Sequence, residues 1–337
     1  MVPFAYAAAP SADAAIAHVA RRRGAEFIAG GTDMLQLLQE GVRVPAELVD
    51  INRLPLDGIE VDTDAVRIGA TARMSDVADH PRIRAEYPAV AEALLLSASP
   101  QVRNMASIGG NLLQRTRCVY FRDVVTPCNK RAPGSGCSAL DGENRLHAIL
   151  GVSPHCIATY AGDLAVALVA LDANVVINGP EGARTLPVEA LHRVPGDAPE
   201  IETVLEPGDL ITAVLIPASA HARRSHYLKV RDRASYEFAL ASAAVALELA
   251  EGMIRSARVA LGGVATKPWR AYEAEKALVG QRPGDAVFQA AADAALARAP
   301  SGSPRRVSAG KRPLSFCFGG AACSRRAFIS VAGVSGA

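Results

Sequence analysis

Four cysteines lie close together in the middle of the chain, and thiolates are strong ligands for soft metals. Nine, eight and eighteen residues separate them in turn. Four thiolates are the number that an iron–sulfur cluster or a structural zinc ion requires. The intervals match neither a paired zinc ribbon nor the compact ferredoxin run, so they do not select the metal. Two disulfides or four buried thiols are the alternatives; we rank them lower because the segment has few apolar residues to fold around. The cysteines are Cys118, Cys128, Cys137 and Cys156.

Basic side chains surround the cysteines and could offset the negative charge of a metal–thiolate cluster. His155, beside the last cysteine, is more typical of a neighbour than of a ligand. Cys317 and Cys323 lie far along the chain and are expected to be incidental. The basic residues are Arg115, Arg117, Arg122, Lys130, Arg131 and Arg145.

Two glycine-rich turns are the second feature with chemical potential: Ala29–Asp33 and Ser107–Asn111. Glycine lets the backbone approach a ligand closely, and clustered backbone amides favour a phosphate. Neither turn matches the GxGxxG fingerprint or the Walker lysine pattern, which disfavours a classical NAD or ATP site. Taken singly, each is more typical of an ordinary turn. As a pair flanked by hydroxyl and amide side chains, the two turns fit a pyrophosphate site as well as they fit ordinary turns.

Other catalytic patterns are missing from the sequence. There is no HExxH zinc motif, and Gly134–Gly136 is too short for the GxSxG nucleophile elbow. No paired carboxylates with an evident acid–base environment can be identified, so hydrolysis is poorly supported. The charged stretch Lys229–Arg233 is typical of a solvated strand edge.

The elements around these turns are mixed in type. A helix over 11–23 is expected, with Ser11 as its N-cap, and a short strand over 26–29 leads into the first turn. Glu251–Gly252 between two apolar runs predicts a β-hairpin. Strands and helices follow each other without a regular βαβ alternation, which favours an α+β fold over a doubly wound sheet. The segment 118–156 has no sustained hydrophobic period, which indicates a function or a bound ion.

Composition excludes several classes of protein. The chain has 337 residues and a net charge of +2, too balanced for a general nucleic-acid binder. No apolar run approaches the roughly 20 residues of a membrane-spanning helix. The N-terminus lacks the basic and apolar regions of a signal peptide, so we expect no export signal. Residues 299–337 are rich in Ser, Gly, Pro and Arg and contain no acid, so we expect a flexible tail, such as a shifted reading frame would produce.

Three motifs in order resemble the FAD-binding subunit of the molybdenum hydroxylases, the family of xanthine dehydrogenase, carbon monoxide dehydrogenase and aldehyde oxidoreductases. The motifs are Phe27–Met34, Ala106–Leu112 and Lys229–Ser235. The cysteine segment is similar to an insertion in the FAD subunit of bacterial periplasmic aldehyde oxidoreductase, where it carries a 4Fe–4S cluster. The likeness extends from the N-terminus to about residue 290.

The resemblance implies an α+β fold: a p-cresol-methylhydroxylase-type FAD domain of two α/β lobes over 1–220, with an iron–sulfur insertion over 114–157. A smaller C-terminal domain would follow over 223–290. The two glycine-rich turns would hold the FAD pyrophosphate, while Asp163, Ile211 and Lys229 would lie near the flavin. The implied FAD contacts are Phe27, Ile28, Ala29, Gly30, Gly31, Thr32, Asp33, Met34, Ser107, Gly109, Gly110, Asn111, Asp163, Ile211 and Lys229. The four cysteines of the insertion would bind the 4Fe–4S cluster.

The resemblance also implies a function. The chain would be the electron-transfer FAD subunit of a molybdenum-containing aldehyde or xanthine-type oxidoreductase. Its partners would be a molybdenum-cofactor large subunit, a 2Fe–2S small subunit and an external electron acceptor. Without a signal of its own it would be cytoplasmic, or periplasmic if exported with a signal-bearing partner. The alternatives are a zinc-binding or disulfide-stapled interaction module without flavin, and a self-contained flavin oxidase.

Overall fold

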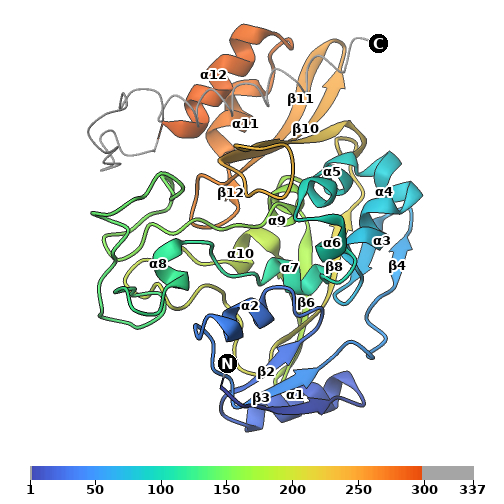
Figure 1. Ribbon diagram of the computed structural model, residues 1–337. Coiled ribbons are helices and arrows are strands. Elements are labelled where there is room, and N and C mark those ends of the chain that lie inside the picture. The colour runs from blue at the N-terminus through green and yellow to red at the C-terminus, as the bar shows by residue number, and fades with distance from the viewer. Residues whose placement is uncertain (1, 298–337) are drawn as a thin grey trace.

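Three β-sheets organise the chain, and the computed structural model describes them within residues 2–297 (Figure 1). The first is a parallel sheet in the order β1-β3-β2. The expected first helix is present as α1 (Ala12–Arg21), and the Ala14 N–H donates to the Ser11 hydroxyl at 3.1 Å. The three strands are β1 (Ala5–Ala8), β2 (Ala25–Ile28) and β3 (Glu47–Asp50). The expectation of a tail over 299–337, like Cys317 and Cys323, lies outside the described residues.

The second sheet has five antiparallel strands in the order β4-β5-β8-β6-β7. Its strands are β4 (Ile59–Val61), β5 (Ala65–Gly69), β6 (Asn174–Gly179), β7 (Gly182–Pro187) and β8 (Leu210–Pro217). Pro81, Pro88 and Pro100 each begin a helix, where the missing proline N–H is not needed. The helices that follow β5 are α3 (Met74–Asp79), α4 (Pro81–Glu86), α5 (Pro88–Leu96), α6 (Pro100–Arg103) and α7 (Ile108–Leu112).

The third sheet is antiparallel, in the order β12-β11-β10-β9; helix α11 packs on β11, and α12 packs on α11. The expected hairpin is confirmed: β10 pairs with β11, and both Glu251 and Gly252 at its turn have positive φ. The elements are β9 (Ser225–Val230), β10 (Ala241–Ala250), β11 (Met253–Gly262), β12 (Trp269–Arg270), α11 (Tyr272–Leu278) and α12 (Asp285–Leu296), preceded by a 3₁₀ turn over Ala222–Arg224. The mixed architecture confirms the expected α+β class.

Helix α9 (Leu164–Ala170) connects the second and third sheets through the main apolar core. All seven of its residues are buried, because it packs between α5 on one side and β10 and β11 on the other. A single core cluster therefore includes α9 together with Ala244, Ala246 and Ala260 of the third sheet. A short helix, α10 (Val188–Leu191), packs beside it. No helix within residues 2–297 is long and apolar enough to cross a bilayer.

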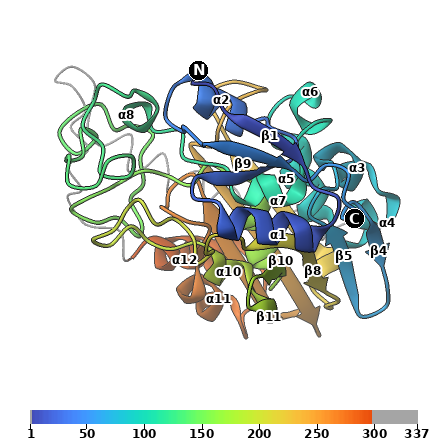
Figure 2. The same cartoon turned by 90° about the horizontal axis from the view of Figure 1, so that it is seen from below.

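The cysteine insertion is almost entirely loop, as its lack of hydrophobic period predicts. It contains helix α8 (Val119–Arg122) and lies at one side of the molecule in both views (Figures 1 and 2). Beside it is α2 (Met34–Gln39), whose Leu37 belongs to the same small apolar cluster as the cysteines. The insertion therefore rests on the helix that directly follows the first glycine-rich turn.

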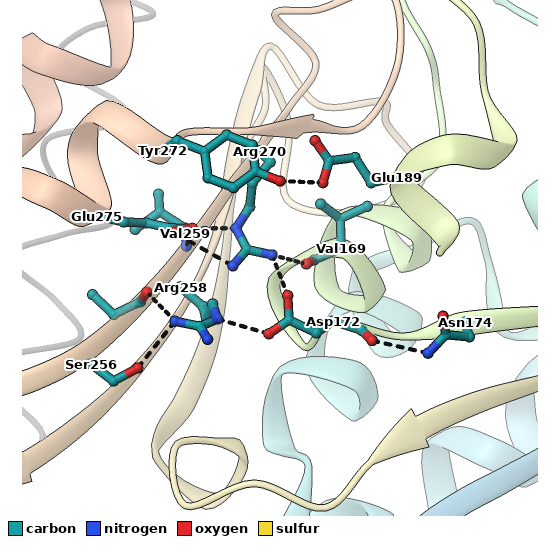
Figure 3. Close-up of polar contacts among 11 residues, drawn as sticks. Val169, Asp172, Asn174, Glu189, Ser256, Arg258, Val259, Arg270, Tyr272 and Glu275 are labelled. Carbon is teal, nitrogen blue, oxygen red and sulfur yellow. Dashed lines mark hydrogen bonds and ion pairs between the residues drawn. The ribbon is translucent and has the colours of Figure 1, made fainter. Parts of the chain in front are cut away.

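Arg270 forms a polar junction between the third sheet and the end of α9 (Figure 3). Its side chain is 5% exposed and donates to the Val169 carbonyl and to the Asp172 carboxylate, both at 2.7 Å. It also pairs with Glu275, and Arg258 donates to the other Asp172 oxygen at 2.7 Å. The junction therefore ties helix α9 to the third sheet by charge as well as by apolar packing.

Substitution of Arg270 tests this junction. Arg270→Leu leaves Glu275 buried without its guanidinium, and removal of one partner of a buried ion pair costs about 3–5 kcal/mol. We expect a loss of that size in the free energy of unfolding, measured by urea denaturation of the full chain. Arg255→Leu, on the neighbouring strand and 72% exposed, is the matched control and should change stability by about 0.5 kcal/mol or less. Equal losses in both variants would contradict the assignment.

Asp172 gives the junction a pH dependence. Burial alone would raise the pKa of Asp172, but the hydrogen bonds and charges of Arg258 and Arg270 bring it below its ordinary value. Such a carboxylate stabilises the fold above the unfolded pKa of about 3.9, and this contribution is lost as pH falls through the lowered folded pKa. Asp172→Asn should therefore narrow the difference in Tm between pH 7 and pH 3. An equal narrowing in the exposed Asp57→Asn variant would show that the effect is not specific.

Candidate functional site

A cleft of about 1110 Å³ lies between the two glycine-rich turns and extends to strands β8 and β9. This volume slightly exceeds the roughly 300–1,000 Å³ of typical small-molecule sites, so an extended ligand fits. Every residue that the resemblance implies as an FAD contact lines this cleft. They are Phe27, Ile28, Ala29, Gly30, Gly31, Thr32, Asp33, Met34, Ser107, Gly109, Gly110, Asn111, Asp163, Ile211 and Lys229. The structure thus brings five separate segments of the chain to one cavity.

The first turn requires glycine for two reasons. A Cβ atom on Gly30 would lie 2.0 Å from the Met105 carbonyl oxygen, so the turn packs directly on the backbone that precedes the second turn. Gly31 has a φ of +70°, a conformation that side-chain-bearing residues rarely adopt. The two turns are therefore held together by backbone contact and form one continuous wall of the cleft.

The second turn leads into helix α7 and is fixed at both of its ends. At the start, the Gly110 N–H donates to the Ser107 hydroxyl at 3.3 Å. At the end, the Leu112 carbonyl accepts from the Tyr160 hydroxyl at 3.2 Å and lies 2.8 Å from the His192 Nε2. Burial lowers the pKa of His192 to about 4, so at neutral pH its ring is neutral and its Nε2–H donates to this carbonyl. These contacts preorganise the turn.

A buried polar cluster lies beneath the cleft where the flavin contacts are expected. One Asp163 carboxylate oxygen accepts from Lys229 Nζ and from the Ser97 hydroxyl, each at 2.8 Å. The other accepts from the Tyr227 hydroxyl at 2.6 Å. Burial and then the charge of Asp163 raise the pKa of Tyr227 well above its ordinary value, so the phenol keeps its proton. Lys229 also donates to the Leu96 carbonyl at 3.1 Å.

The interpretation of Lys229–Arg233 as a solvated strand edge is wrong at its first residue. The Lys229 side chain is 1% exposed. Strand β9 packs against α5, and this packing buries the face of the strand that carries Lys229. Sequence reasoning also missed Ser97 and Tyr227. Tyr227 stands two positions before Lys229 on the same strand face, a period-2 signal that would have identified it.

A loop between β9 and β10 supplies a further wall of the cleft, most of which lies beyond the third sequence motif. Its residues Arg233, Tyr236, Glu237 and Phe238 line the cavity. Tyr236 and Phe238 are exposed aromatic side chains, and Phe238 lies 5.0 Å from the Arg117 guanidinium, in cation–π geometry. This loop therefore contacts the cysteine insertion as well as the cleft.

The structure gathers the four cysteines into one small apolar cluster with Phe121, Ala139 and Ala158. None of the four forms a disulfide, so the disulfide interpretation is not supported. Burial raises the pKa of Cys118 to about 12, and its sulfur lies 3.1 Å from the His147 Nε2. Within the described residues, no three His, Cys, Asp or Glu side chains converge as the ligands of one metal ion would.

The basic residues around the cysteines hydrogen-bond or pair with other parts of the chain. Arg131 donates to the Tyr120 and Phe121 carbonyls, each at 2.8 Å, and so organises the loop backbone. The others pair with carboxylates, mostly outside the insertion, and attach it to the rest of the molecule. These pairs are Arg115 with Glu202, Arg117 with Asp33, Arg122 with Asp33 and Glu40, Lys130 with Glu202, and Arg145 with Asp232.

Comparisons with known proteins agree with this geometry. The model of the FAD binding domain in molybdopterin dehydrogenase matches residues 2–219, and that of the CO dehydrogenase flavoprotein C-terminal domain matches residues 226–312. The chain belongs to this family: it is an FAD-binding subunit of a molybdenum hydroxylase. The interaction module without flavin is thereby excluded.

Individual relatives place the chain further within the family. It is 51% identical to the aldehyde oxidoreductase FAD-binding subunit PaoB of Escherichia coli (strain K12) over 257 residues, which cover 76% of this chain and 79% of that one. It is 29% identical to the carbon monoxide dehydrogenase medium chain of Hydrogenophaga pseudoflava over 301 residues, 88% of each chain. A solved structure of carbon monoxide dehydrogenase from that organism superposes with a TM-score of 0.74 at 28% identity, covering 99% of both chains.

The second turn provides a clean test of the cleft. A Cβ on Gly110 would meet the Ser107 hydroxyl at 2.8 Å, and no other atom lies within 4 Å outside its own helix backbone. Gly110→Val should therefore displace the Ser107 hydroxyl and crowd the adjoining part of the cleft, and bound FAD should fall. The measurement is flavin absorbance per chain, with thermal unfolding of the apo form. Gly284→Val, where an added Cβ meets nothing within 4 Å, is the control. Wild-type flavin content in Gly110→Val would contradict the assignment.

Proposed function

We propose that this chain is the electron-transfer FAD subunit of a heteromeric molybdenum-containing aldehyde oxidoreductase. The observation that carries the proposal is the convergence of five segments, distant in sequence, on one cleft of about 1110 Å³. The choice of aldehyde rather than xanthine as the substrate class is supported by the 51% identity to an aldehyde oxidoreductase FAD-binding subunit. We retain the expected division into an FAD domain over 1–220, with its insertion over 114–157, and a C-terminal domain over 223–290.

The residues of this chain bind and orient the flavin. The backbone of the two glycine-rich turns would hold the pyrophosphate, and Gly30 and Gly31 give the first turn the close packing and positive φ that such a backbone site needs. Beneath the cleft, the Asp163 carboxylate holds the Lys229 ammonium in one position. The Ser97 and Tyr227 hydroxyls donate the other hydrogen bonds to that carboxylate. Bound FAD supplies the redox chemistry, accepting electrons from partner centres and releasing them to an external acceptor. The protein contributes binding and electrostatics, and no side chain of this subunit is required as a general base.

We further propose that the four cysteines bind a 4Fe–4S cluster. Four unpaired thiols share one apolar cluster, and their loop has no sustained secondary structure to hold it together. Cys128 and Cys137 lie opposite each other across an antiparallel bridge, and the Ala158 N–H donates to the Cys156 sulfur at 3.4 Å. Such backbone donors to sulfur stabilise thiolate ligands. The donor set suits an iron–sulfur cluster better than a hard cation.

The partners that we propose are a molybdenum-cofactor large subunit and a 2Fe–2S small subunit. Relatives named as a medium chain or as an FAD-binding subunit support a multi-subunit assembly. The proposed compartment is the cytoplasm, or the periplasm if the chain is exported with a signal-bearing partner, and the electrons pass to an external acceptor. The subunit should not oxidise aldehydes when purified alone, although dithionite should reduce its flavin. Aldehyde turnover by the isolated chain would favour a self-contained oxidase instead.

Cofactor content tests both parts of the proposal. Anaerobically purified chain should contain about one FAD and about four irons, with flavin bands above broad iron–sulfur absorbance. Cys128→Ser and Cys137→Ser should each lose the iron and retain at least part of the flavin. The matched control is Cys317→Ser with Cys323→Ser, which should retain both cofactors. Wild-type iron in both ligand variants would overturn the cluster, while a colourless wild-type chain would overturn the whole assignment.

A further inference from the structure

The carboxylate of Asp33 is engaged by the cysteine insertion, although Asp33 belongs to the first glycine-rich turn. One oxygen accepts from the Arg115 backbone N–H at 2.8 Å. The other accepts from the Arg117 guanidinium at 2.5 Å and from the Arg122 guanidinium at 2.8 Å. Burial alone would raise the pKa of Asp33, but the charges of Arg117 and Arg122 and the hydrogen bonds bring it below its ordinary value. All of these donors come from the first nine residues of the insertion.

The same short segment carries the first cysteine. Arg117 directly precedes Cys118, and the Arg122 Nε donates to the Thr116 carbonyl at 3.1 Å, so both arginines are fixed by the backbone around that cysteine. Arg122 also donates to Glu40 at 3.0 Å, just beyond the end of α2. Asp33 and Glu40, at the two ends of α2, therefore both bind arginines of the insertion.

A second attachment connects the insertion to the opposite wall of the cleft. Arg145 donates to both oxygens of Asp232, at 2.8 and 2.9 Å, and Phe238 lies under the Arg117 guanidinium. Asp232 lies near the start of the β9–β10 loop, whose later residues line the cavity. The insertion thus contacts both the first turn and the β9–β10 loop, two parts of the lining of the cleft.

We propose that Asp33 is a positioning residue that couples the metal loading of the cysteine insertion to the retention of FAD. The insertion contains little regular structure, so the metal orders the backbone that presents Arg115, Arg117 and Arg122. These residues hold Asp33, and Asp33 holds the turn against the flavin pyrophosphate. Coupling of this kind is reciprocal: bound FAD must strengthen metal binding by the same factor by which bound metal strengthens FAD binding. The inference rests on the proposed cluster and FAD sites.

A double-mutant cycle on the full chain tests the coupling. FAD release is followed by the recovery of flavin fluorescence in the wild type, Asp33→Asn, Cys128→Ser and the double variant. We expect each single variant to release FAD about tenfold faster, the factor that corresponds to about 1.4 kcal/mol, close to the lower end of the range for hydrogen bonds to a charged group. The double variant should be no faster than the singles, because both changes break one linkage.

Iron loss to a chelator provides an independent measurement that does not require a cysteine variant to fold. Asp33→Asn should lose iron several-fold faster than the wild type, and added FAD should slow this loss in the wild type but not in the variant. Asp123→Asn, an exposed aspartate within the insertion whose carboxylate accepts from the Val125 N–H, is the matched control and should behave as wild type in both measurements.

The outcomes separate this inference from the proposed function. A wild-type chain without iron or flavin would refute the proposed function itself. A chain that binds both, with additive effects of Asp33→Asn and Cys128→Ser on FAD release, would show that Asp33 contacts FAD directly and would overturn the coupling. Unchanged iron loss in Asp33→Asn would overturn it as well, with the two cofactor sites left intact.

Discussion

The buried contact between Asp163 and Lys229 is the interaction on which the site and the arrangement of the chain both depend. Asp163 stands at the start of α9, in the FAD domain, whereas Lys229 lies on β9 of the third sheet. Two charges removed from water are stable only where every remaining polar atom finds a partner. Ser97, Tyr227 and the Leu96 carbonyl provide these partners. Leu96 and Ser97 lie at the end of α5 and Tyr227 lies on β9, so the pair fixes α5, α9 and β9 relative to one another beside the cleft.

The parts of the site that could be predicted from sequence are those whose requirements are local. Gly30 and Gly31 predict a turn with a backbone geometry that favours glycine, and Ser107 predicts the start of a helix. The hairpin at Glu251–Gly252 is equally local, and the structure contains it. The environment of Lys229 depends instead on which helix covers its strand, which no short window of sequence contains. Without α5, the alternating charges after Lys229 are indistinguishable from those of an exposed edge.

The cysteine insertion also shows that sequence predicts local features but not the pairing of distant residues. Its cysteine content pointed to a metal, and its lack of hydrophobic period correctly predicted a loop. The arginines around it suggested charge compensation for a cluster, yet most of them form ion pairs with carboxylates elsewhere in the chain. Composition identifies which charges are present, whereas their pairing is a property of the tertiary structure. The insertion has little apolar surface with which to pack on the rest of the chain. Ion pairs therefore hold it in place.

This mode of attachment has a consequence for the cleft. Apolar packing is non-directional, so a loop held by a hydrophobic face could slide without losing much contact. Ion pairs with hydrogen-bond geometry, such as those of Arg122 and Arg145, fix both the distance and the direction of their partners. The partners of Arg122 are Asp33 and Glu40, which flank α2, and the partner of Arg145 is Asp232, in the β9–β10 loop. Because α2 with its preceding turn and the β9–β10 loop both contribute to the lining of the cleft, the cysteine loop is fixed to two parts of that lining by directional contacts rather than by apolar packing alone.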